Sequence, residues 1–452
     1  MSSVPVLLVA YYFPPLGGAG TQRAAAFARW LPAFGYEPVV VTGTGTAGTA
    51  SAPVLDPSLR RGIGEDTAVV RVRDRGPAAL GARRRIMWEA RVRTDRDTWA
   101  ASVATTAVET ARRAGARAAV ITVSPYAAAE LGPLLRSDLG IPWILDLRDP
   151  WTLDGWRVHP SRLHAVRDRT RMREAIRAAD LVIANTPAAR RAFIDLAELP
   201  PRRVVTIPNG FEPGDVPAPP PARAPDGTFR LVHTGWLHDP RPRRLGWRRA
   251  RWRDLDETGR SGRYLLEGLA LLARRRPDLR ERVRLELVGQ VHPGHWSLAR
   301  DLGVADMVVE RGYLPHSESL AVLRAAELAF VPLSGVPPGE EALVVPGKLY
   351  EALAAGVPVL ACLPPGDARR LAIAAGAVVC GPDRPDQITD ALERLVDEWR
   401  AGASADVPRM PESFARERLT GRLARALDAV RGQGEPPEGD PWEELGATPS
   451  RA

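Results

Sequence analysis

Short apolar segments alternate with helix-like segments through the N-terminal half of the chain. Each apolar segment is rich in β-branched residues and ends in a polar or Gly/Pro loop, which predicts a buried strand. The segments between them repeat apolar residues at helical spacing, which predicts helices packed on one face. Strands alternating with helices are typical of a parallel sheet built from βαβ units. The predicted strands are 4–10, 38–42, 68–72, 118–124, 142–147, 181–184 and 204–207, and the predicted helices are 21–34, 98–114, 126–139, 162–178 and 187–196.

The alternation stops at a proline-rich segment, 212–227, and then resumes. Such a composition predicts a linker, because it supports neither helical nor strand periodicity. The sequence therefore predicts an N-terminal domain at 1–212, a linker at 213–228, a C-terminal domain at 229–410, a crossover helix at 411–431 and a disordered tail at 432–452. In the second half the predicted strands are 229–233, 284–288, 328–333, 358–363 and 377–379, and the predicted helices are 264–275, 317–326, 347–355, 387–400 and 413–431.

Two α/β domains of this kind predict two Rossmann-like folds that face each other across a cleft. Ligands of open parallel sheets bind beyond the carboxyl ends of the strands, so we expect the ligand in that cleft. The 452 residues, 45% apolar and 26% charged, suit two folded domains and exclude overall disorder or a fibrous repeat. The two cysteines, Cys362 and Cys380, cannot build a disulfide framework and are expected as buried thiols.

The N-terminal apolar run has no basic region before it and no small-residue cleavage site after it. It therefore does not match a signal peptide, and no apolar run reaches the length of a membrane span. We expect a cytoplasmic protein. The formal net charge of +8 is spread over a long chain and does not by itself identify a partner.

A glycine-rich loop follows the first predicted strand and opens the first predicted helix. Gly17, Gly18 and Gly20 would expose backbone N–H groups at a helix N-terminus, which favours an anion. A dinucleotide fingerprint would need glycine where Arg23 stands, and the loop is longer than that tight turn. The alternative is that these glycines only permit a close crossing of the chain.

A second candidate site lies at the start of the helix predicted at 347–355. Lys348 is the sole lysine of the chain, and it falls in the first helical turn, after Pro346. Glu351 follows on the same face one turn later. A cation beside free N–H groups suits a pyrophosphate, and a carboxylate suits a ribose diol. The alternative is an ordinary ion pair on a solvent-facing helix surface.

Polar residues also end the strand predicted at 142–147. Asp149 would face the cleft and orient a hydroxyl group, or it would pair with Arg148 and close the loop. Two other patterns do not predict a metal. Asp95 and Asp97 match a metal signature of an unrelated fold by chance, and His292 and His295 lack a third ligand nearby.

Five motifs occur in order along the chain. They are the loop 11–23, Asp-Leu-Arg-Asp-Pro-Trp-Thr at 146–152, Ala-Asn-Thr-Pro at 184–187, Ile-Pro-Asn-Gly-Phe-Glu at 207–212, and the segment 346–358. Together they resemble the family 4 nucleotide-sugar-dependent glycosyltransferases, which have the GT-B fold, over about residues 4–430. The resemblance implies a retaining enzyme that needs no cofactor and no catalytic metal.

The resemblance also implies roles for residues of both domains. It places the nucleotide in the C-terminal domain and the acceptor mainly in the N-terminal one. Lys348 would bind the diphosphate, Glu351 the ribose, and Leu349 would lie in the same donor site. The Gly17–Gly18 loop with Gly20 would contact the sugar-phosphate region. Lys348, Glu351 and Asp149 would take part in catalysis.

The chain departs from the family pattern at two places. Many relatives carry two glutamates eight positions apart, but Leu343 stands eight positions before Glu351, and Glu340 and Glu341 are out of register. Relatives also carry an arginine soon after the first strand of the second domain. Here that strand runs into a basic insertion, in which the candidates for this donor-binding role are Arg241, Arg243 and Arg244.

Arginines gather at 83–85, 167–177 and 241–253. They would dock on the anionic inner face of a membrane, contact nucleic acid, or simply be solvated; nucleic acid is the partner that we do not expect. The expected partners are a nucleoside diphosphate sugar and a carbohydrate, lipid-linked or small-molecule acceptor. The expected setting is synthesis of a cell-surface polysaccharide, a glycolipid or a glycosylated natural product.

Two rival functions fit the same sequence. An epimerase of the same fold would act on a nucleotide sugar without an acceptor. A catalytically inactive nucleotide-sugar-binding protein, suggested by the missing first glutamate, would bind without turnover.

Overall fold

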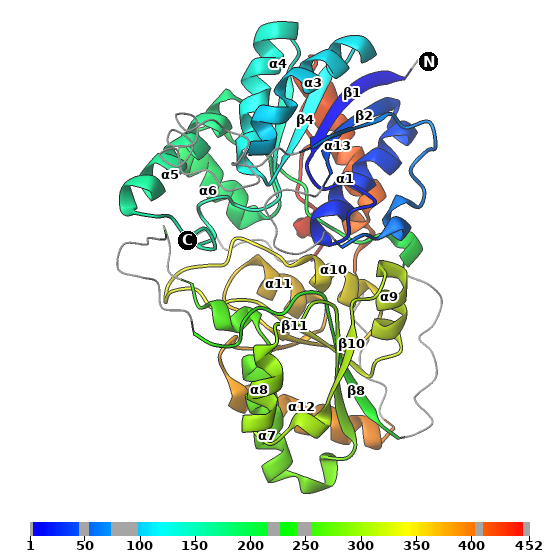
Figure 1. The fold of residues 1–452 in the computed structure, drawn as a ribbon, viewed down its shortest axis with the longest axis vertical. Helices are drawn as coiled ribbons and strands as arrows, with labels where there is room; N and C mark the ends of the chain where they lie inside the picture. The colour runs from blue at the N-terminus through cyan, green and yellow to red at the C-terminus, as the bar shows by residue number, and fades with distance from the viewer. Residues whose placement is uncertain are drawn as a thin grey trace. The chain divides into compact units, whose positions relative to one another are not determined.

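A computed structural model describes residues 3–44, 54–73, 98–215, 227–242, 251, 255–402 and 410–445. The chain divides into two compact units, each with its own parallel sheet (Figure 1). Unit 1 contains Met1–Asn209 and Ser413–Pro441, and unit 2 contains Gly210–Arg244 and Asp254–Glu412. The two Rossmann-like α/β folds that the sequence predicts are therefore present.

The sheet of unit 1 has the strand order β3-β2-β1-β4-β5-β6-β7. All neighbouring strands are parallel; Val6 of β1, for example, aligns with Pro38 on one side and Ala118 on the other. Every residue of β4 and β5 is buried, as expected for strands covered on both faces. The strands are β1 (Val4–Ala10), β2 (Tyr36–Gly43), β3 (Val69–Val72), β4 (Ala118–Val123), β5 (Trp143–Leu147), β6 (Leu181–Ala184) and β7 (Val204–Thr206).

Two helices of unit 1, α5 and α6, begin at a residue whose side chain caps the helix. Ser161 accepts a hydrogen bond from the amide of His164 at the start of α5, and Thr186 accepts one from Ala189 at the start of α6. Where one helix was predicted at 126–139, a 3-10 helix, Tyr126–Glu130, precedes α4, because Pro133 has no N–H for an i→i−4 bond. The helices are α1 (Ala19–Trp30), α3 (Thr98–Ala114), α4 (Leu131–Leu139), α5 (Arg162–Ala178), α6 (Pro187–Ala197) and α13 (Arg416–Val430).

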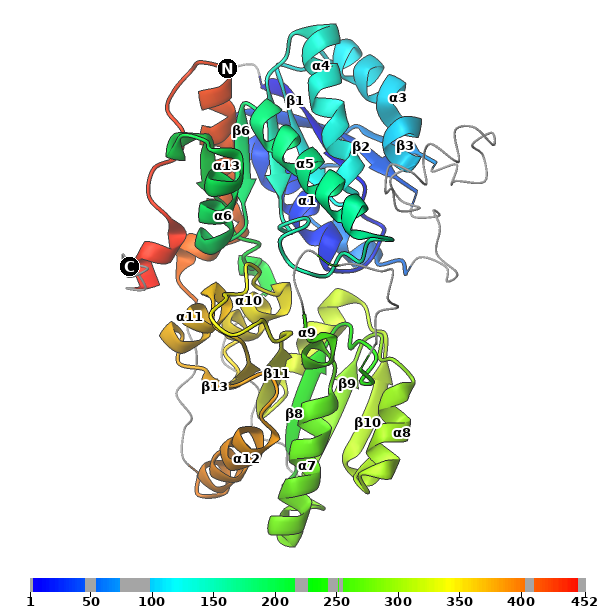
Figure 2. The same cartoon turned by 90° about the vertical axis from the view of Figure 1, so that its left-hand side faces the viewer.

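Helix α13 follows the sheet of unit 2 in the sequence and completes the core of unit 1. It packs beside α1 (Figure 2). Its residues Leu419, Leu423 and Leu427 join Val6 and Leu8 of β1 in one buried cluster. The core on this face therefore depends on two segments that are far apart in the sequence.

The segment after α13 differs from the prediction of a disordered tail over 432–452. Residues 432–445 belong to the described part of the chain. The guanidinium of Arg422 donates hydrogen bonds to the carbonyl oxygens of Glu438 and Gly439. These contacts hold a segment that has no apolar periodicity of its own.

The sheet of unit 2 is also parallel, with the order β10-β9-β8-β11-β12-β13. The strands are β8 (Phe229–Thr234), β9 (Val283–Val288), β10 (Val308–Gly312), β11 (Leu328–Pro332), β12 (Val359–Cys362) and β13 (Val378–Cys380). The helices are α7 (Arg263–Arg275), α8 (Gly294–Asp301), α9 (His316–Arg324), α10 (Gly347–Ala354), α11 (Asp367–Ala374) and α12 (Pro385–Arg400). Cys362 and Cys380 are free and buried, as expected.

Helices α7 and α12 pack against each other over one face of this sheet. A Cβ atom at Gly268 of α7 would lie 2.9 Å from Cγ2 of Ile388, so the close approach of the two helices requires glycine. No helix of the described ranges is both long and apolar enough to cross a membrane. The predicted linker lies mostly outside the described residues.

Candidate functional site

The N-terminus of α10 lies at the carboxyl edge of the unit 2 sheet, because α10 follows β11 along the chain. Pro346 precedes the helix in an extended conformation, and no side chain caps the helix end. Lys348, in the first turn, sends its side chain toward β8. Its Nζ lies 3.0 Å from Nε2 of His233 and 3.4 Å from the carbonyl oxygen of Trp236. The Lys348 ammonium and the N-terminus of α10 therefore lie close together.

Glycines let the backbone approach this ammonium closely. Gly235, directly after β8, has φ +99°, and a Cβ atom there would lie 3.4 Å from Nζ of Lys348. Gly289, directly after β9, has φ +128°, and a Cβ atom there would lie 2.4 Å from the carbonyl oxygen of Gly235. Side chains at these positions would be strained and would crowd the loops around Lys348.

The pKa of Lys348 lies close to neutral pH. Burial and, to a smaller extent, the nearby charge of Arg260 lower the pKa of Lys348 to about 7, while the charge of Glu351 opposes the shift. Burial and the Lys348 charge also hold the pKa of His233 well below its usual value. An anion that binds here would stabilise the protonated lysine.

Glu351 lies one turn further along α10, with its side chain 15% exposed. Its Oε1 atom is buried and accepts no hydrogen bond in the part of the chain that the structure describes. The nearest basic group is His316 at the start of α9, with 3.7 Å between Nε2 and Oε1. Nε2 of His316 lies closer to Asp215, at 3.2 Å. The Glu351 carboxylate therefore retains capacity to accept from a ligand hydroxyl.

Leu349, placed in the donor site by resemblance, cannot contribute a ligand contact here. Its side chain is fully buried, and its amide donates to the carbonyl oxygen of Pro346. It packs α10 on the core of unit 2.

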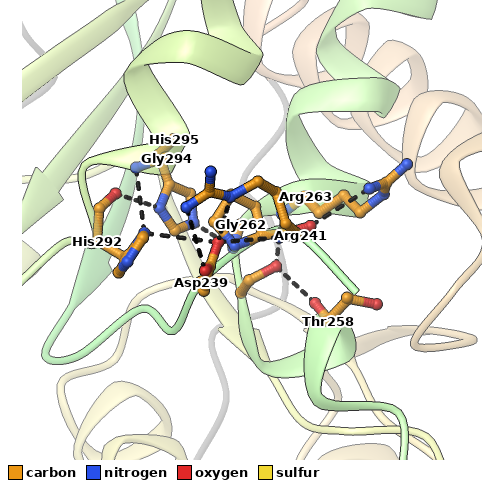
Figure 3. A network of polar contacts seen from close by, with 10 residues as sticks. Asp239, Arg241, Thr258, Gly262, Arg263, His292, Gly294 and His295 are labelled. Carbon is orange, nitrogen blue, oxygen red and sulfur yellow. Dashed lines mark hydrogen bonds and ion pairs between the residues drawn. The ribbon is translucent and has the colours of Figure 1, made fainter. Parts of the chain in front are cut away.

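Of the arginines expected after β8 as donor ligands, Arg241 forms an ion pair with a neighbouring carboxylate. Arg241 is 71% exposed, and its guanidinium is paired with the carboxylate of Asp239 at 3.1 Å (Figure 3). Arg243 and Arg244 lie outside the described residues. Arg260, which the sequence analysis did not single out, lies close enough to Lys348 to lower its pKa. Arg260 is therefore a second positive charge near the start of α10.

The histidine pair considered as a metal site is used by the backbone instead. The amide of Gly262 donates to Nε2 of His295 at 3.0 Å, and Nδ1 of His295 donates to the carbonyl oxygen of His292 at 2.8 Å (Figure 3). Both ring nitrogens of His295 are therefore committed to the loops before α7 and α8. Asp95 and Asp97 lie outside the described residues.

In unit 1 the glycine-rich loop lies at the start of α1, next to Arg148. Gly18, with φ +96°, precedes the helix and is exposed. A Cβ atom at Gly20 would lie 2.4 Å from Nη1 of Arg148, so the arginine packs directly on the loop. The amide of Gly17 donates to the carbonyl oxygen of Val54 and is not available to an anion.

Arg148 also links the loop to Asp149. Its guanidinium lies over the ring of Tyr12 at 5.2 Å and is 3.4 Å from the carboxylate of Asp149. The pairing that the sequence left as an alternative is thus present, although Asp149 keeps 46% of its side chain exposed. It remains accessible to an acceptor hydroxyl.

A buried ion pair supports this edge of unit 1. Arg23 and Asp146 are both buried, with 2.7 Å between Nη2 and Oδ1. Thr122 donates to Oδ2 of Asp146, and Arg23 donates to the carbonyl oxygen of Pro208. The network ties the ends of β4, β5 and β7 to α1, which explains why Arg23 replaces the glycine of a dinucleotide fingerprint.

Comparison with protein-family models assigns both halves of the chain. Residues 17–210 match the glycosyl transferase 4-like domain, and residues 258–398 match the glycosyl transferases group 1 domain.

Known proteins agree with this assignment. The chain is 29% identical over 282 residues to D-inositol 3-phosphate glycosyltransferase 1 of Catenulispora acidiphila; the match covers 57% of this chain and 60% of the relative. Among solved structures, sucrose-phosphate synthase from Thermosynechococcus elongatus superimposes with a TM-score of 0.57 at 14% identity, covering 98% of this chain and 96% of that one. Anabaena HepE in complex with UDP gives a TM-score of 0.54 at 14% identity, covering 95% and 98%.

The structural likenesses show the fold, and the domain models supply the family. Both models describe glycosyltransferase domains, in the order in which the two units follow each other along the chain. The chain therefore belongs to the GT-B glycosyltransferases, with a glycosyl transferase 4-like domain followed by a glycosyl transferases group 1 domain.

Proposed function

We propose that this protein transfers a sugar from a nucleoside diphosphate sugar to an acceptor hydroxyl. The observation that carries the proposal is the arrangement along α10, where the Lys348 ammonium and the unbonded Oε1 atom of Glu351 lie one turn apart. A diphosphate offers oxygens to the first group, and ribose hydroxyls offer hydrogen-bond donors to the second. The complex of HepE with UDP supports UDP as the nucleotide to test first.

The proposed chemistry places negative charge on the departing diphosphate. The Lys348 ammonium, the Arg260 guanidinium and the amides of Gly347 and Lys348 at the start of α10 would stabilise that charge as the bond to the sugar breaks. In a reaction with retention, the departing phosphate takes the proton of the acceptor on the same face of the sugar. No separate base and no metal ion are then required.

The acceptor side of the proposal rests on unit 1. The exposed carboxylate of Asp149 would orient an acceptor hydroxyl, and the loop at Gly18 and Gly20 would contact the sugar-phosphate region. Arg148, packed on Gly20, would add a cation to that loop.

A peripheral contact with an anionic membrane belongs to the same proposal, since a lipid-linked acceptor would lie there. The start of α5 exposes Leu163 and Val166, 58% and 51% exposed, beside exposed Arg162 and Arg167. Apolar side chains flanked by arginines suit a headgroup surface. Residues 83–85 and most of 241–253, the other arginine-rich segments, lie outside the described residues.

The proposal is tested by donor binding and donor hydrolysis. Calorimetry should show that UDP binds the wild-type protein, that Lys348→Met weakens binding at least about tenfold, and that Lys348→Arg retains part of it, since a lost charge-assisted contact has a cost of that order. A panel of nucleotide sugars, incubated with EDTA and without an acceptor, should show slow hydrolysis of one donor.

Each result distinguishes the rival functions. A changed sugar in the recovered nucleotide sugar would identify an epimerase. Binding without hydrolysis, and without transfer to any of a set of alcohols and glycosides, would indicate an inactive binding protein. Wild-type affinity for UDP in Lys348→Met would contradict the assignment of the diphosphate to α10.

A further inference from the structure

The side chains of His233 and Lys348 meet inside unit 2, with 3.0 Å between Nε2 and Nζ. His233 is fully buried, and its Nδ1 lies 3.0 Å from the carbonyl oxygen of Phe330 on β11. A carbonyl only accepts hydrogen bonds, so Nδ1 carries the imidazole proton and Nε2 keeps its lone pair. Lys348 therefore donates one N–H to a neutral imidazole.

We propose that His233 is a positioning residue, whose Nε2, together with the carbonyl oxygen of Trp236, holds the Lys348 ammonium at the N-terminus of α10 and leaves its third N–H group for an anionic oxygen. The inference rests on the proposed function, in which that anion is the diphosphate of the donor. The backbone fixes the imidazole: His233 lies on β8, and Phe330 lies on the adjacent strand β11.

A neutral acceptor suits this task better than a carboxylate would. A carboxylate 3 Å from Nζ would neutralise the ammonium and compete with the phosphate for it. A neutral imidazole orients the ammonium and leaves its charge for the ligand. Protonation of His233 would set two cations 3.0 Å apart, which its burial opposes.

The charged and titratable groups around the pair also favour an anion. Arg260, at the end of the 3-10 helix Glu257–Arg260, acts on Lys348 as a second cation, and Glu351 on α10 acts with the opposite sign. His295 on α8 acts on His233 and is itself held neutral by burial. With no ligand present, burial and the charge of Arg260 disfavour the protonated form of Lys348. Above pH 7, binding of a diphosphate should therefore be accompanied by protonation of Lys348.

The sole lysine of the chain makes this residue directly observable. Protein labelled with 13C and 15N only at lysine gives one side-chain signal, which needs no assignment. In the wild-type protein we expect UDP to raise the titration midpoint of that signal by at least one pH unit. We also expect a resolved ammonium cross-peak near pH 6, because an N–H held by a buried acceptor exchanges slowly with water.

Two substitutions at position 233 separate the two hydrogen bonds of the imidazole. Gln places its amide oxygen near the position of Nε2, and so retains an acceptor for Lys348. Asn places its amide NH₂ near the position of Nδ1, and so retains only the contact with Phe330. We expect His233→Asn to weaken UDP binding about tenfold and to reduce the UDP-induced rise of the lysine midpoint, and His233→Gln to restore most of both.

A double-mutant cycle tests the direct link. In a Lys348→Met background, His233→Asn should cause no further loss of UDP affinity, because its effect acts through the ammonium. Thermal unfolding of every variant shows whether the fold is retained. If His233→Asn does not fold, the wild-type cross-peak and its UDP-dependent shift still decide, and a lysine signal that exchanges rapidly and ignores UDP overturns the inference.

The failures are distinguishable. Equal losses in the Asn and Gln variants, or an unchanged UDP affinity in His233→Asn, would overturn the positioning role while leaving Lys348 as a diphosphate ligand. Unchanged affinity in Lys348→Met would instead overturn the proposed function itself.

Discussion

The ammonium of Lys348 makes donor binding depend on pH in the neutral range. Its pKa in the free protein is about 7, mainly because the side chain is partly buried, and only the protonated form attracts a diphosphate. UDP affinity should therefore be constant below pH 7 and fall as the pH rises above it, by up to about tenfold per pH unit, until the raised pKa of the complex is reached. Calorimetry between pH 6 and pH 9, in buffers of different ionisation enthalpy, measures both the affinity and the proton uptake.

The matched control for this pH dependence is Lys348→Arg. Arginine stays charged throughout the range, so the decline above pH 7 should disappear in this variant. UDP titrates in the same way in both experiments, and the difference between the two proteins isolates the lysine. Parallel pH profiles would show that Lys348 does not govern binding.

The Glu351 carboxylate provides a second test at the residue scale. Glu351→Gln keeps the shape of the side chain but removes its negative charge. A hydrogen bond to a charged group contributes about 1.5–3 kcal/mol, and part of that free energy of binding should be lost. UDP should bind at least about tenfold more weakly, and the loss should shrink for a UDP analogue that lacks a ribose hydroxyl. An exposed glutamate, Glu398 on α12, gives the control Glu398→Gln, which should bind UDP as the wild type does. Equal losses with UDP and its analogue would place Glu351 away from the ribose.

At the scale of elements, periodicity identified every strand of unit 1 and the long helices of both units. It missed β10, α8 and α11 for physical reasons. Strand β10 lies at an edge of its sheet and contains Glu310 and Arg311, so it lacks a continuous apolar run. Helix α8 begins at Gly294, directly after Pro293, and a Pro-Gly pair is typical of a turn rather than of a helix start. Helix α11 has eight residues, too few for a clear period.

In the candidate site, too, some features follow from local sequence and others depend on the fold. Lys348 and Glu351 could be predicted because helix signals around them are local in the sequence. The contact between His233 and Lys348 spans 115 positions and depends on how β8, β11 and α10 come together. Arg260 was hidden in an insertion rich in arginine, where no local pattern separates one guanidinium from another. Long-range contacts of this kind need the fold.

Helix α4 depends on a glycine for its packing on β5. A Cβ atom at Gly132 would lie 2.2 Å from the indole of Trp143, which is fully buried and cannot move aside. We expect Gly132→Ala to destabilise unit 1 by about 2 kcal/mol despite the better helix propensity of alanine. In Gly20→Ala the close neighbour is the end of the flexible Arg148 side chain, so stability should change little. Denaturant unfolding of the two variants measures the difference, and similar midpoints would contradict this account.

At the scale of the whole molecule, each unit has its own apolar core. The core of unit 1 combines segments from the two ends of the chain. The sheet of unit 2 and the helices that cover it lie between Gly210 and Glu412, with Leu392 of α12 packed among residues of β8 and α7. Unit 1 needs α13, which is made only after the sheet of unit 2. During synthesis, the apolar faces of β1 and α1 therefore remain partly uncovered until the end of the chain appears.

Because the two cores are separate, a cavity made by substitution in one core should destabilise only the unit that contains it. Leu423→Ala in α13 removes a fully buried side chain from the core of unit 1, and Leu392→Ala in α12 does the same in unit 2. Each should cost about 2–5 kcal/mol. Hydrogen exchange of the full chain should then become faster in β1 and α1 but not in β8 and α7 for Leu423→Ala, and the reverse should hold for Leu392→Ala. Because α13 is distant from β1 in sequence, faster exchange of β1 in Leu423→Ala would show that the end of the chain stabilises its beginning. Faster exchange in both units with either variant would mean that the two cores unfold as one, contrary to this prediction.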